Sequence, residues 1–493
     1  MRTKRCACVA FALLAACVSS TPATTWYITP DGSGDAPTIR AAVDSAAFGD
    51  TLLLADGTYV GNGNRDVRIS GPSIVVRSES GNPETCVIDC EDPEGNHQAF
   101  VVWNNSTIEG ITIINGIATN GGAILCTSGV TIRNCVFSGN RAGWGGAIEI
   151  GSAPGAQIID CTFIENTAVN NGGAIAVTSF VFSLTVSNCL FVGNTARFGA
   201  GMHFRRQATF AITDCTFLEN EAQGEGAKGG GIHFDDGSSG IVSNCTFAWN
   251  VAQSGGGVLC QDSSLLFEQC TFVGNKALLS LGSGVRCWGM TSAIFTNTVI
   301  AFSSPGVGVH CSSVSTATLT CSNVYGNAGG DWIGCLAGQD SVGGNLSEDP
   351  LFCNPNPLHD DFTLAAGSPC LPLNNSCGVL IGAHGEGCGT ATGIRPENGK
   401  AQRLIRVTNH PNPFNPRTII TYSVASPGQV KVGVYDVRGR MVTTLVREFK
   451  IPGEYTMDWD GRDSRGNQVG TGVYFVRLET GGQTASRKIV FLK

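Results

Sequence analysis

The amino-acid sequence predicts an all-β protein: a right-handed parallel β-helix solenoid with an N-terminal capping helix, followed by a small C-terminal β-sandwich. Three observations support this fold class. Glycine supplies 66 of the 493 residues and charged residues only 14%, a composition that disfavours helix interiors. A short phrase recurs through the middle of the chain. The sequence from residue 404 onward then changes in charge and pattern.

The recurring phrase is a cysteine, any residue, a phenylalanine, two further residues and an asparagine. Six copies follow one another at intervals of 25 to 30 residues, and their cysteines are Cys135, Cys161, Cys189, Cys215, Cys245 and Cys270. Upstream of each copy stands a start of small residues such as GGAI or GGGI. A period of this length indicates a solenoid, in which each unit buries its apolar face only against its neighbours.

Each unit shows two or three short strands separated by turns and no helical pattern. Within 148–150 we expect the two isoleucines to point inward and the glutamate outward, and within 161–163 the cysteine and phenylalanine to point inward. The Asn, Asp or Gln before each cysteine and the asparagine that closes each phrase fit sharp bends, because Asn and Asp tolerate left-handed backbone. Stacked units would therefore form ladders of Cys, Phe and Asn.

The cysteines divide into groups with different expected roles. Of the 21 cysteines, Cys6, Cys8 and Cys17 lie near the N-terminus, which leaves 18 for the folded part. We expect the repeat cysteines to be stacked buried thiols rather than disulfides, because buried cysteine behaves as a small hydrophobe. Disulfides are expected in the less regular segment, which holds Cys335, Cys353, Cys370, Cys377 and Cys388. No zinc-type pair occurs, so we expect no bound metal.

Residues 1–23 are predicted to be a signal peptide. Three basic residues among the first five precede an apolar run over 6–18, which is too short to span a bilayer as a mature helix. Cleavage after 21–23 would release a soluble chain. Alternatively, the bacterial lipobox-like LAAC ending at Cys17 would leave that cysteine lipidated and anchored. In both cases we expect the protein to be extracellular or on the outer cell surface, with no transmembrane segment.

The segment before the repeats has the composition of a short helix. Pro37 begins the run PTIRAAV, and a helix here would cover the open end of the solenoid. DGSGDAPTIRAAV resembles the N-terminal cap of the pectate-lyase-like superfamily, which includes pectin esterases. The GGAI and FxxN phrases resemble the repeat of polymorphic outer-membrane proteins, which are autotransported adhesins, and 349–388 resembles the usual exit from such helices in exported bacterial proteins. These resemblances imply the fold but not an activity.

The C-terminal segment reads as alternating strands separated by Gly, Asp and Asn turns, which predicts a small β-sandwich. Its phrases PNPFNP, VYDVRGR, WDGRD, GVYFVRL and RKIVFLK resemble the flagellar-hook-cap-type Ig-like domain and the type IX secretion C-terminal sorting domain. The resemblance implies contact with secretion machinery, or retention at the cell surface. Autotransported adhesins carry a large C-terminal translocator barrel that this sequence lacks, so we expect export by other machinery.

The expected organisation is a signal peptide over 1–23, a right-handed parallel β-helix over 24–392, a linker over 393–403 and the Ig-like sorting or anchoring domain over 404–493. Charge differs between the modules. The whole chain carries −8, and the segment from residue 401 onward holds 14 Lys and Arg against 7 Asp and Glu, or +7, which leaves −15 for the rest. A net negative charge argues against a nucleic-acid partner.

The outward positions of the GGA strands supply the candidate ligand-binding face. Three histidines, two arginines, an aspartate and a tryptophan fall in two adjacent outward columns: His203, Arg205, His233, Asp235, Arg286, Trp288 and His310. Enzymes with parallel β-helices act on polysaccharides along such a sheet. Acidic calcium ligands are few here, however, and Glu149 lies three coils from Asp235, about 14 Å at one strand spacing per coil. Paired glycosidase carboxylates lie roughly 5 to 9.5 Å apart.

The sequence therefore favours an exported surface protein without catalytic activity, an adhesin or carbohydrate-binding protein whose partner is a polysaccharide or another cell-surface component. The alternative is a polysaccharide lyase or hydrolase acting in a groove on the outer face. Only the lyase alternative calls for a cofactor, which would be calcium. A third interpretation is a structural rod, which would self-associate and bind no ligand.

Overall fold

A computed structural model describes residues 22–91, 95–180, 183–355, 361–388, 407–412, 414–424, 428–436, 440–450, 453–480 and 483–491. The chain forms two compact units, residues 1–391 and 392–493. The predicted signal peptide with Cys17, except its last two residues, and the predicted linker lie outside the described residues. No helix in the described part of the chain is both long and apolar enough to cross a membrane.

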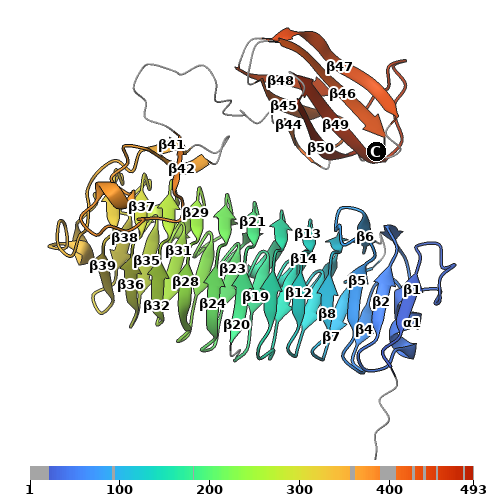
Figure 1. Ribbon diagram of the computed structural model, residues 1–493, viewed down its shortest axis with the longest axis horizontal. Coiled ribbons are helices and arrows are strands. Elements are labelled where there is room, and N and C mark those ends of the chain that lie inside the picture. Colours follow the sequence, from blue (N-terminus) through green and yellow to red (C-terminus); the bar gives the residue numbers. More distant parts are fainter. Residues whose placement is uncertain are drawn as a thin grey trace, which may run out of the picture. The chain divides into compact units, whose positions relative to one another are not determined.

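The first unit is a solenoid of parallel strands whose coils stack side by side (Figure 1). We number its sheets by the order in which a coil visits them. Sheet 1 has twelve strands: β1 (Thr25–Ile28), β2 (Thr51–Leu54), β5 (Val75–Ser78), β8 (Thr107–Glu109), β12 (Thr131–Arg133), β16 (Gln157–Ile159), β20 (Leu184–Ser187), β24 (Thr209–Thr213), β28 (Ser239–Ser243), β32 (Ser264–Glu268), β36 (Ser292–Thr296) and β39 (Thr316–Thr320).

Sheet 2 carries the Cys-x-Phe phrases. Its eleven strands are β3 (Gly57–Tyr59), β6 (Cys86–Asp89), β9 (Thr112–Ile114), β13 (Val136–Ser138), β17 (Thr162–Ile164), β21 (Leu190–Val192), β25 (Thr216–Leu218), β29 (Thr246–Ala248), β33 (Thr271–Val273), β37 (Val299–Ala301) and β40 (Asn323–Tyr325). Sheet 3 is shorter. Its seven strands are β10 (Ile117–Asn120), β14 (Arg141–Trp144), β18 (Thr167–Asn171), β22 (Thr195–Ala196), β26 (Glu221–Ala222), β30 (Val251–Ser254) and β34 (Lys276–Leu281).

Sheet 4 carries the GGA strands. Its ten strands are β4 (Val67–Ile69), β7 (Phe100–Val102), β11 (Ile124–Cys126), β15 (Ile148–Ile150), β19 (Ile175–Val177), β23 (Met202–Phe204), β27 (Ile232–Phe234), β31 (Val258–Gln261), β35 (Val285–Trp288) and β38 (Val309–Cys311). A coil that visits all four sheets has four strands, whereas two or three were expected. Two of the seven strands of sheet 3 have only two residues, and the periodic signal in the sequence is weakest there.

Identical side chains stack inside the solenoid, as the repeat predicts. The six repeat phenylalanines form a continuous column with ring centroids 4.5 to 5.0 Å apart: Phe137, Phe163, Phe191, Phe217, Phe247 and Phe272. The residue before each repeat cysteine has positive φ, from 50° at Asn134 to 55° at Asp160. This confirms the bend expected at that position.

The asparagine that closes each phrase was predicted to form a bend, and it does not. Positive φ falls on the residue before it, such as Gly139 or Glu165, and the asparagine itself is fully buried. Asn220, for example, accepts a hydrogen bond from the Asn194 amide side chain (2.9 Å) and donates to the Phe191 carbonyl (3.0 Å) and to Asn250 (2.9 Å). This ladder pairs backbone groups that the corner would otherwise leave unsatisfied.

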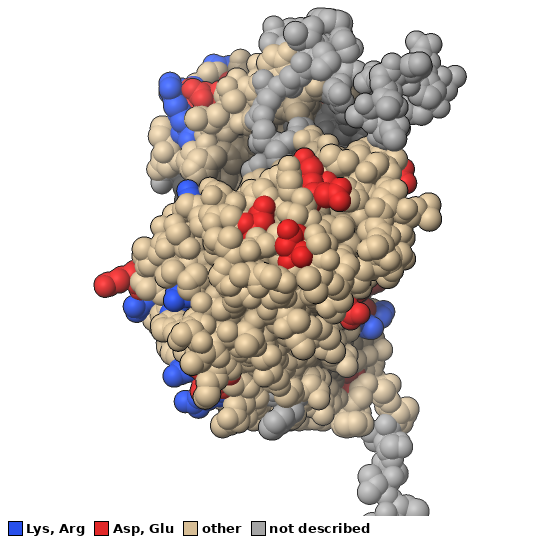
Figure 2. Space-filling view, turned by 90° about the vertical axis from the view of Figure 1, so that its left-hand side faces the viewer, with Lys and Arg blue, Asp and Glu red and all other residues tan. Residues whose placement is uncertain are grey.

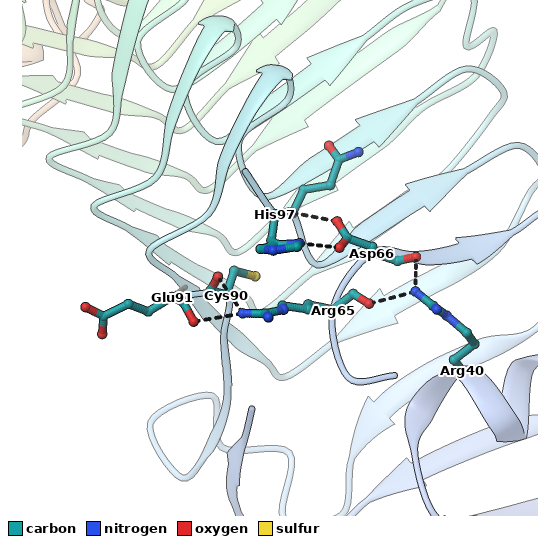
Figure 3. A network of polar contacts seen from close by, with 7 residues as sticks. Arg40, Arg65, Asp66, Cys90, Glu91 and His97 are labelled. Atoms are coloured by element: carbon teal, nitrogen blue, oxygen red, sulfur yellow. Dashed lines mark hydrogen bonds and ion pairs between the residues drawn. The ribbon is translucent and has the colours of Figure 1, made fainter. Parts of the chain in front are cut away.

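The predicted capping helix is present as α1 (Ile39–Ser45), with the Thr38 hydroxyl accepting from the Ala41 amide at its N-terminus. A polar network joins α1 to the first coils (Figure 3). Arg40 donates to the backbone carbonyls of Arg65 and Asp66, and the Asp66 carboxylate contacts His97. These contacts bind the cap to the coil that it covers.

The prediction of buried repeat thiols is confirmed, and the prediction of disulfides is confirmed in part, because Cys370 is free and two of the partners, Cys311 and Cys321, lie before the predicted segment. All six repeat cysteines are buried free thiols. Disulfides join Cys311 to Cys335, Cys321 to Cys377 and Cys353 to Cys388, whereas Cys370 is free. The segment that closes the solenoid also contains η1 (Gly334–Leu336), β41 (Phe352–Asn354), β42 (Asp361–Ala365), η2 (Pro372–Asn374) and β43 (Glu386–Cys388). Covalent links thus occur where the repeat ends.

The second unit packs two antiparallel sheets around one apolar core, as predicted for an Ig-like sandwich. One sheet contains β44 (Val407–His410), β45 (Thr418–Val424) and β48 (Gly453–Trp459). The other contains β47 (Met441–Lys450), β46 (Gly428–Asp436), β49 (Gly472–Thr480) and β50 (Gln483–Phe491). Ile420 from the first sheet and Val432 from the second share the core.

The asparagine ladder yields the first test. We expect Asn220→Ala to lower the free energy of unfolding by roughly 2–4 kcal/mol, because it leaves the buried Asn194 amide and Phe191 carbonyl without partners. Denaturant titration followed by circular dichroism would measure the change. Glu221→Ala on the same coil is the matched control, because Glu221 is exposed. Equal stability of the two variants would contradict a structural role for the ladder.

Candidate functional site

Sheet 4 carries every side chain of the predicted binding face. Strand register aligns the first outward column, which runs Leu125, Glu149, Ala176, His203, His233, Leu259, Arg286 and His310. Gln261 pairs with Trp288 in the second column, where Arg205 and Asp235 hold the equivalent positions two residues beyond the histidines. The columns therefore occur as the sequence predicted, while their role in binding stays a prediction.

A row of side chains on sheet 3, which we call the sheet 3 wall, faces these columns. It was not predicted from the sequence. It is formed by the last residue before each corner glycine on sheet 3. These residues pair in register from coil to coil and are Trp144, Asn171, Phe198, Lys228, Ser254 and Leu281. A signal for them does exist in the sequence, because each directly precedes the small-residue start of a GGA-type strand.

The corner between sheets 3 and 4 is re-entrant. Gly145 has φ of 63°, and a Cβ there would lie 2.1 Å from the Ile148 carbonyl oxygen, so only glycine fits. Outward side chains of the two sheets meet across this corner. Asn171 contacts His203 (Nδ2 to Nδ1, 3.1 Å), and the Phe198 and His233 ring centroids lie 5.9 Å apart. We call the surface formed by the sheet 3 wall and the two sheet 4 columns the seam.

The seam covers two of the predicted site residues. His203 is 1% exposed and His233 is 2% exposed, so neither ring is available at the surface, although both point outward from sheet 4. The expectation of an open face is wrong at these positions, because the unrecognised third sheet places Asn171 and Phe198 against them. The two rings also contact each other, with centroids 5.0 Å apart.

Burial keeps these histidines neutral. Burial, with smaller contributions from the nearby charges of Arg205 and Lys228, lowers the pKa of His203 to about 3. Burial also holds the pKa of His233 well below its ordinary value, with smaller contributions from His203 and Lys228. His310 lies further along the same column, and its pKa is lowered by burial and by Arg286. These three histidines therefore contribute polar but uncharged groups to the seam.

Positive charge gathers around one exposed indole further along the seam. Trp288 is 39% exposed. The Lys228 ammonium lies 4.4 Å and the Arg286 guanidinium carbon 4.9 Å from centroids of its ring system. Lys228 also donates to Gln261 Oε1 at 3.1 Å, and Arg286 donates to the Ser254 hydroxyl. Both cations are thus held beside the aromatic face by side chains of the seam.

Two further cation–aromatic contacts extend this character along the seam. Arg205 lies 5.8 Å from the Trp144 ring, and Arg197 lies 5.0 Å from the Phe198 ring. Burial lowers the pKa of Lys228 and raises the pKa of Asp235. Both shifts are toward the uncharged forms, as expected for groups that share a partly dehydrated surface.

The carboxylates of the seam are not paired. Glu149 and Asp235 lie on β15 and after β27, three strands apart in sheet 4, which is about 14 Å at the usual spacing. Glu149 is buried, it accepts from the Thr178 hydroxyl at 2.8 Å, and burial raises its pKa. The described residues include no group of three or more His, Cys, Asp or Glu placed to hold a metal ion.

Cations and anions separate along the chain. No lysine or arginine occurs between Arg286 and Arg395. Figure 2 shows this end of the solenoid, where acidic side chains lie among uncharged ones. The cations of the seam therefore form a local cluster on a chain whose total charge is negative.

The class of protein is therefore a right-handed parallel β-helix followed by an Ig-like sandwich. The family model described as right handed beta helix region matches residues 65–239 and 224–345. These matches together span more than half of the chain, and the chain belongs to this family. The FlgD Ig-like domain model matches residues 418–483, in agreement with the sequence resemblance. No curated protein matches the chain.

Solved structures show only limited similarity. Bacteriophage CBA120 tailspike protein 4, in its enzymatically active domain, aligns over 92% of this chain and 64% of its own with 10% identity and a TM-score of 0.36. Dimeric latent PorU from Porphyromonas gingivalis aligns over 20% of this chain and 10% of its own with 23% identity and a TM-score of 0.16. In both cases the chain covers less than two thirds of the other protein.

The buried histidines predict a dependence of stability on pH. His233 has a lowered pKa in the folded state and an ordinary value, about 6.5, when unfolded. As pH falls below 6.5 the unfolded chain takes up protons that the folded chain does not, so stability falls by at most about 1.4 kcal/mol per pH unit for each such histidine. Denaturant titrations from pH 7 to 5.5 should show this slope.

His233→Leu should flatten that slope, because Leu259 shows that leucine fits the adjacent position of the column. His410→Gln is the control, since His410 is exposed in the second unit, and it should leave the slope unchanged. A slope that is the same in His233→Leu as in the wild type would contradict the neutral, buried state of this histidine.

Proposed function

We propose that the protein is an exported carbohydrate-binding protein of the cell surface, and that the seam binds an extended anionic polysaccharide. The observation that carries this proposal is the exposed Trp288 with the Lys228 and Arg286 cations beside it. An indole face packs against the C–H face of a sugar ring, and a lysine and an arginine beside it pair with carboxylate or sulfate groups.

The geometry of the seam fits a chain rather than a single sugar. The Arg205–Trp144 and Lys228–Trp288 contacts lie on successive parts of the same surface, and Arg205 and Trp288 lie three strands apart in sheet 4, about 14 Å. Parallel coils hold these points at fixed spacing. A rigid row of anchors lowers the entropic cost of binding an extended ligand.

Binding is favoured over catalysis by the arrangement of the ionisable groups. The separation of Glu149 from Asp235 exceeds the roughly 5 to 9.5 Å of paired glycosidase carboxylates. The histidines that could move protons are buried and neutral. The enzymatic alternative therefore reduces to a lyase in which Lys228 or Arg205 removes a proton with calcium as cofactor, and product analysis tests it directly.

Export and attachment are also part of the proposal. The basic and apolar start of the sequence supports an export signal, and the match of residues 418–483 to the FlgD Ig-like domain supports a C-terminal module for secretion or surface attachment. Protease shaving of intact expressing cells, followed by mass spectrometry, would detect solenoid peptides outside the cell. Peptides found only after lysis would contradict this part.

The binding proposal is tested with polygalacturonate and its fully methyl-esterified form, in which a methyl ester removes the charge of each carboxylate. We expect the protein to bind the acidic polymer at least tenfold more tightly in calorimetry at low salt, and to lose affinity as salt rises because the cations are screened. Trp288→Ala and the double variant Lys228→Gln/Arg286→Gln should each weaken binding at least tenfold. Arg417→Gln, an exposed arginine of the second unit, is the control.

The same samples distinguish the alternatives. Unsaturated products or new reducing ends that accumulate over hours, with calcium present, would establish the enzyme instead. Equal binding of the two polymers would contradict an anionic ligand. Unchanged binding by both seam variants would contradict the assignment of the ligand to the seam.

A further inference from the structure

A hollow lies on a different sheet from the seam. It is a cavity of about 380 Å³ on the outer face of sheet 1, near the N-terminal end of the solenoid. Its lining residues come from the first five strands of that sheet and are Thr25, Thr51, Leu53, Val75, Arg77, Glu109 and Arg133. Five strands extend over about 19 Å, so the hollow is elongated along the stacking direction.

Strand register arranges the lining into two columns. One runs from Thr25 through Thr51 to Val75. The other runs from Leu53 through Arg77 and Glu109 to Arg133. Hydroxyl and aliphatic groups therefore lie on one side, and the charged groups lie along the other.

One positive charge in the hollow is uncompensated. Arg133 pairs with the Glu109 carboxylate at 2.8 Å. Glu109 is the acidic group of the column nearest to Arg77, and it is therefore already paired. The neighbouring Glu79 accepts from the Tyr27 hydroxyl at 3.2 Å. Arg77 is exposed, and its guanidinium has no hydrogen-bond or ion-pair partner among the described residues. A planar guanidinium with free N–H groups matches a carboxylate in a two-point contact.

The remaining lining suits a sugar ring. Leu53 and Val75 are half-buried and provide apolar contact. The side-chain hydroxyls of Thr25 and Thr51 make no hydrogen bond within the described part of the chain. A pyranose presents C–H groups on its faces and hydroxyls around its rim, so it can use both kinds of group at once. The volume lies at the small end of the range for ligand pockets.

We propose that this hollow is a second binding site, which takes a single sugar carboxylate: a uronic acid, free or at the end of a glycan chain. Arg77 holds the carboxylate, Leu53 and Val75 support the ring, and Thr25 and Thr51 bond to its hydroxyls. The site is independent of the seam, which is built from sheets 3 and 4 and not from sheet 1. It would give the protein separate contacts for a chain and for an acidic sugar.

The site is tested on the full chain by calorimetry and saturation-transfer NMR. The ligands are the acids glucuronate and galacturonate, and the neutral sugars glucose and galactose are compared with them. We expect both acids to bind and both neutral sugars to bind at least tenfold more weakly. Arg77→Gln should weaken binding of the acids at least tenfold, and Arg77→Lys should restore part of it. Arg68→Gln, an exposed arginine on sheet 4, should bind as the wild type does. Equal binding of acids and neutral sugars, or unchanged binding by Arg77→Gln, would overturn the proposal.

Two further comparisons separate this site from the seam and identify the source of the ligand. The Lys228→Gln/Arg286→Gln variant should bind the monosaccharide acids normally, and loss of binding there would overturn the assignment to sheet 1. Methyl glucuronoside imitates a chain end. Binding as tight as that of glucuronate would identify a glycan end as the source, and preference for glucuronate would identify a released sugar. Both results support the site.

Discussion

Parallel in-register stacking is the constraint on which the rest of this structure depends. Each coil places its residues about 4.8 Å from the equivalent residues of the next coil, so every position must tolerate a copy of itself as neighbour. Phenylalanine, asparagine and thiol groups meet that condition, and they form the three ladders of the interior. Like charges do not meet it, because stacked ions repel. Low charge content and many glycines follow from this one requirement.

The glycine corner between sheets 3 and 4 allows the side chains of the seam to differ from coil to coil on an otherwise repetitive scaffold. Positive φ at Gly145, Gly172 and Gly229 directs sheet 3 back toward sheet 4, so outward side chains from two sheets meet instead of diverging. The residue before each corner glycine and the outward residues of the strand after it can vary without disturbing the ladders. Indole, imidazole and ammonium groups therefore gather in the seam, while the interior stays nearly identical from coil to coil.

The sequence was sufficient to predict the solenoid, the cap and the sandwich, because the ladders impose a visible period and the corner bends require Asn, Asp or Gly. It was also sufficient for the outward columns of sheet 4, since strand alternation assigns each side chain to a face. It could not predict that His203 and His233 are buried. Their environment depends on strands as short as Thr195–Ala196, which leave almost no periodic signal, and on contacts such as Phe198 with His233 that form between different coils.

Unpaired polar atoms along the seam carry a cost in stability. Among the described residues, both ring nitrogens of His233, Nε of Arg286 and Nδ1 of His310 are buried and find no hydrogen-bond partner, and each such atom costs stability. Leu259 occupies the same column between His233 and Arg286, so the fold accepts an apolar side chain at this depth. Stability alone would therefore favour leucine along the whole column. Under the proposed function, Arg286 is retained at that cost because it holds a positive charge beside Trp288 for the anionic ligand.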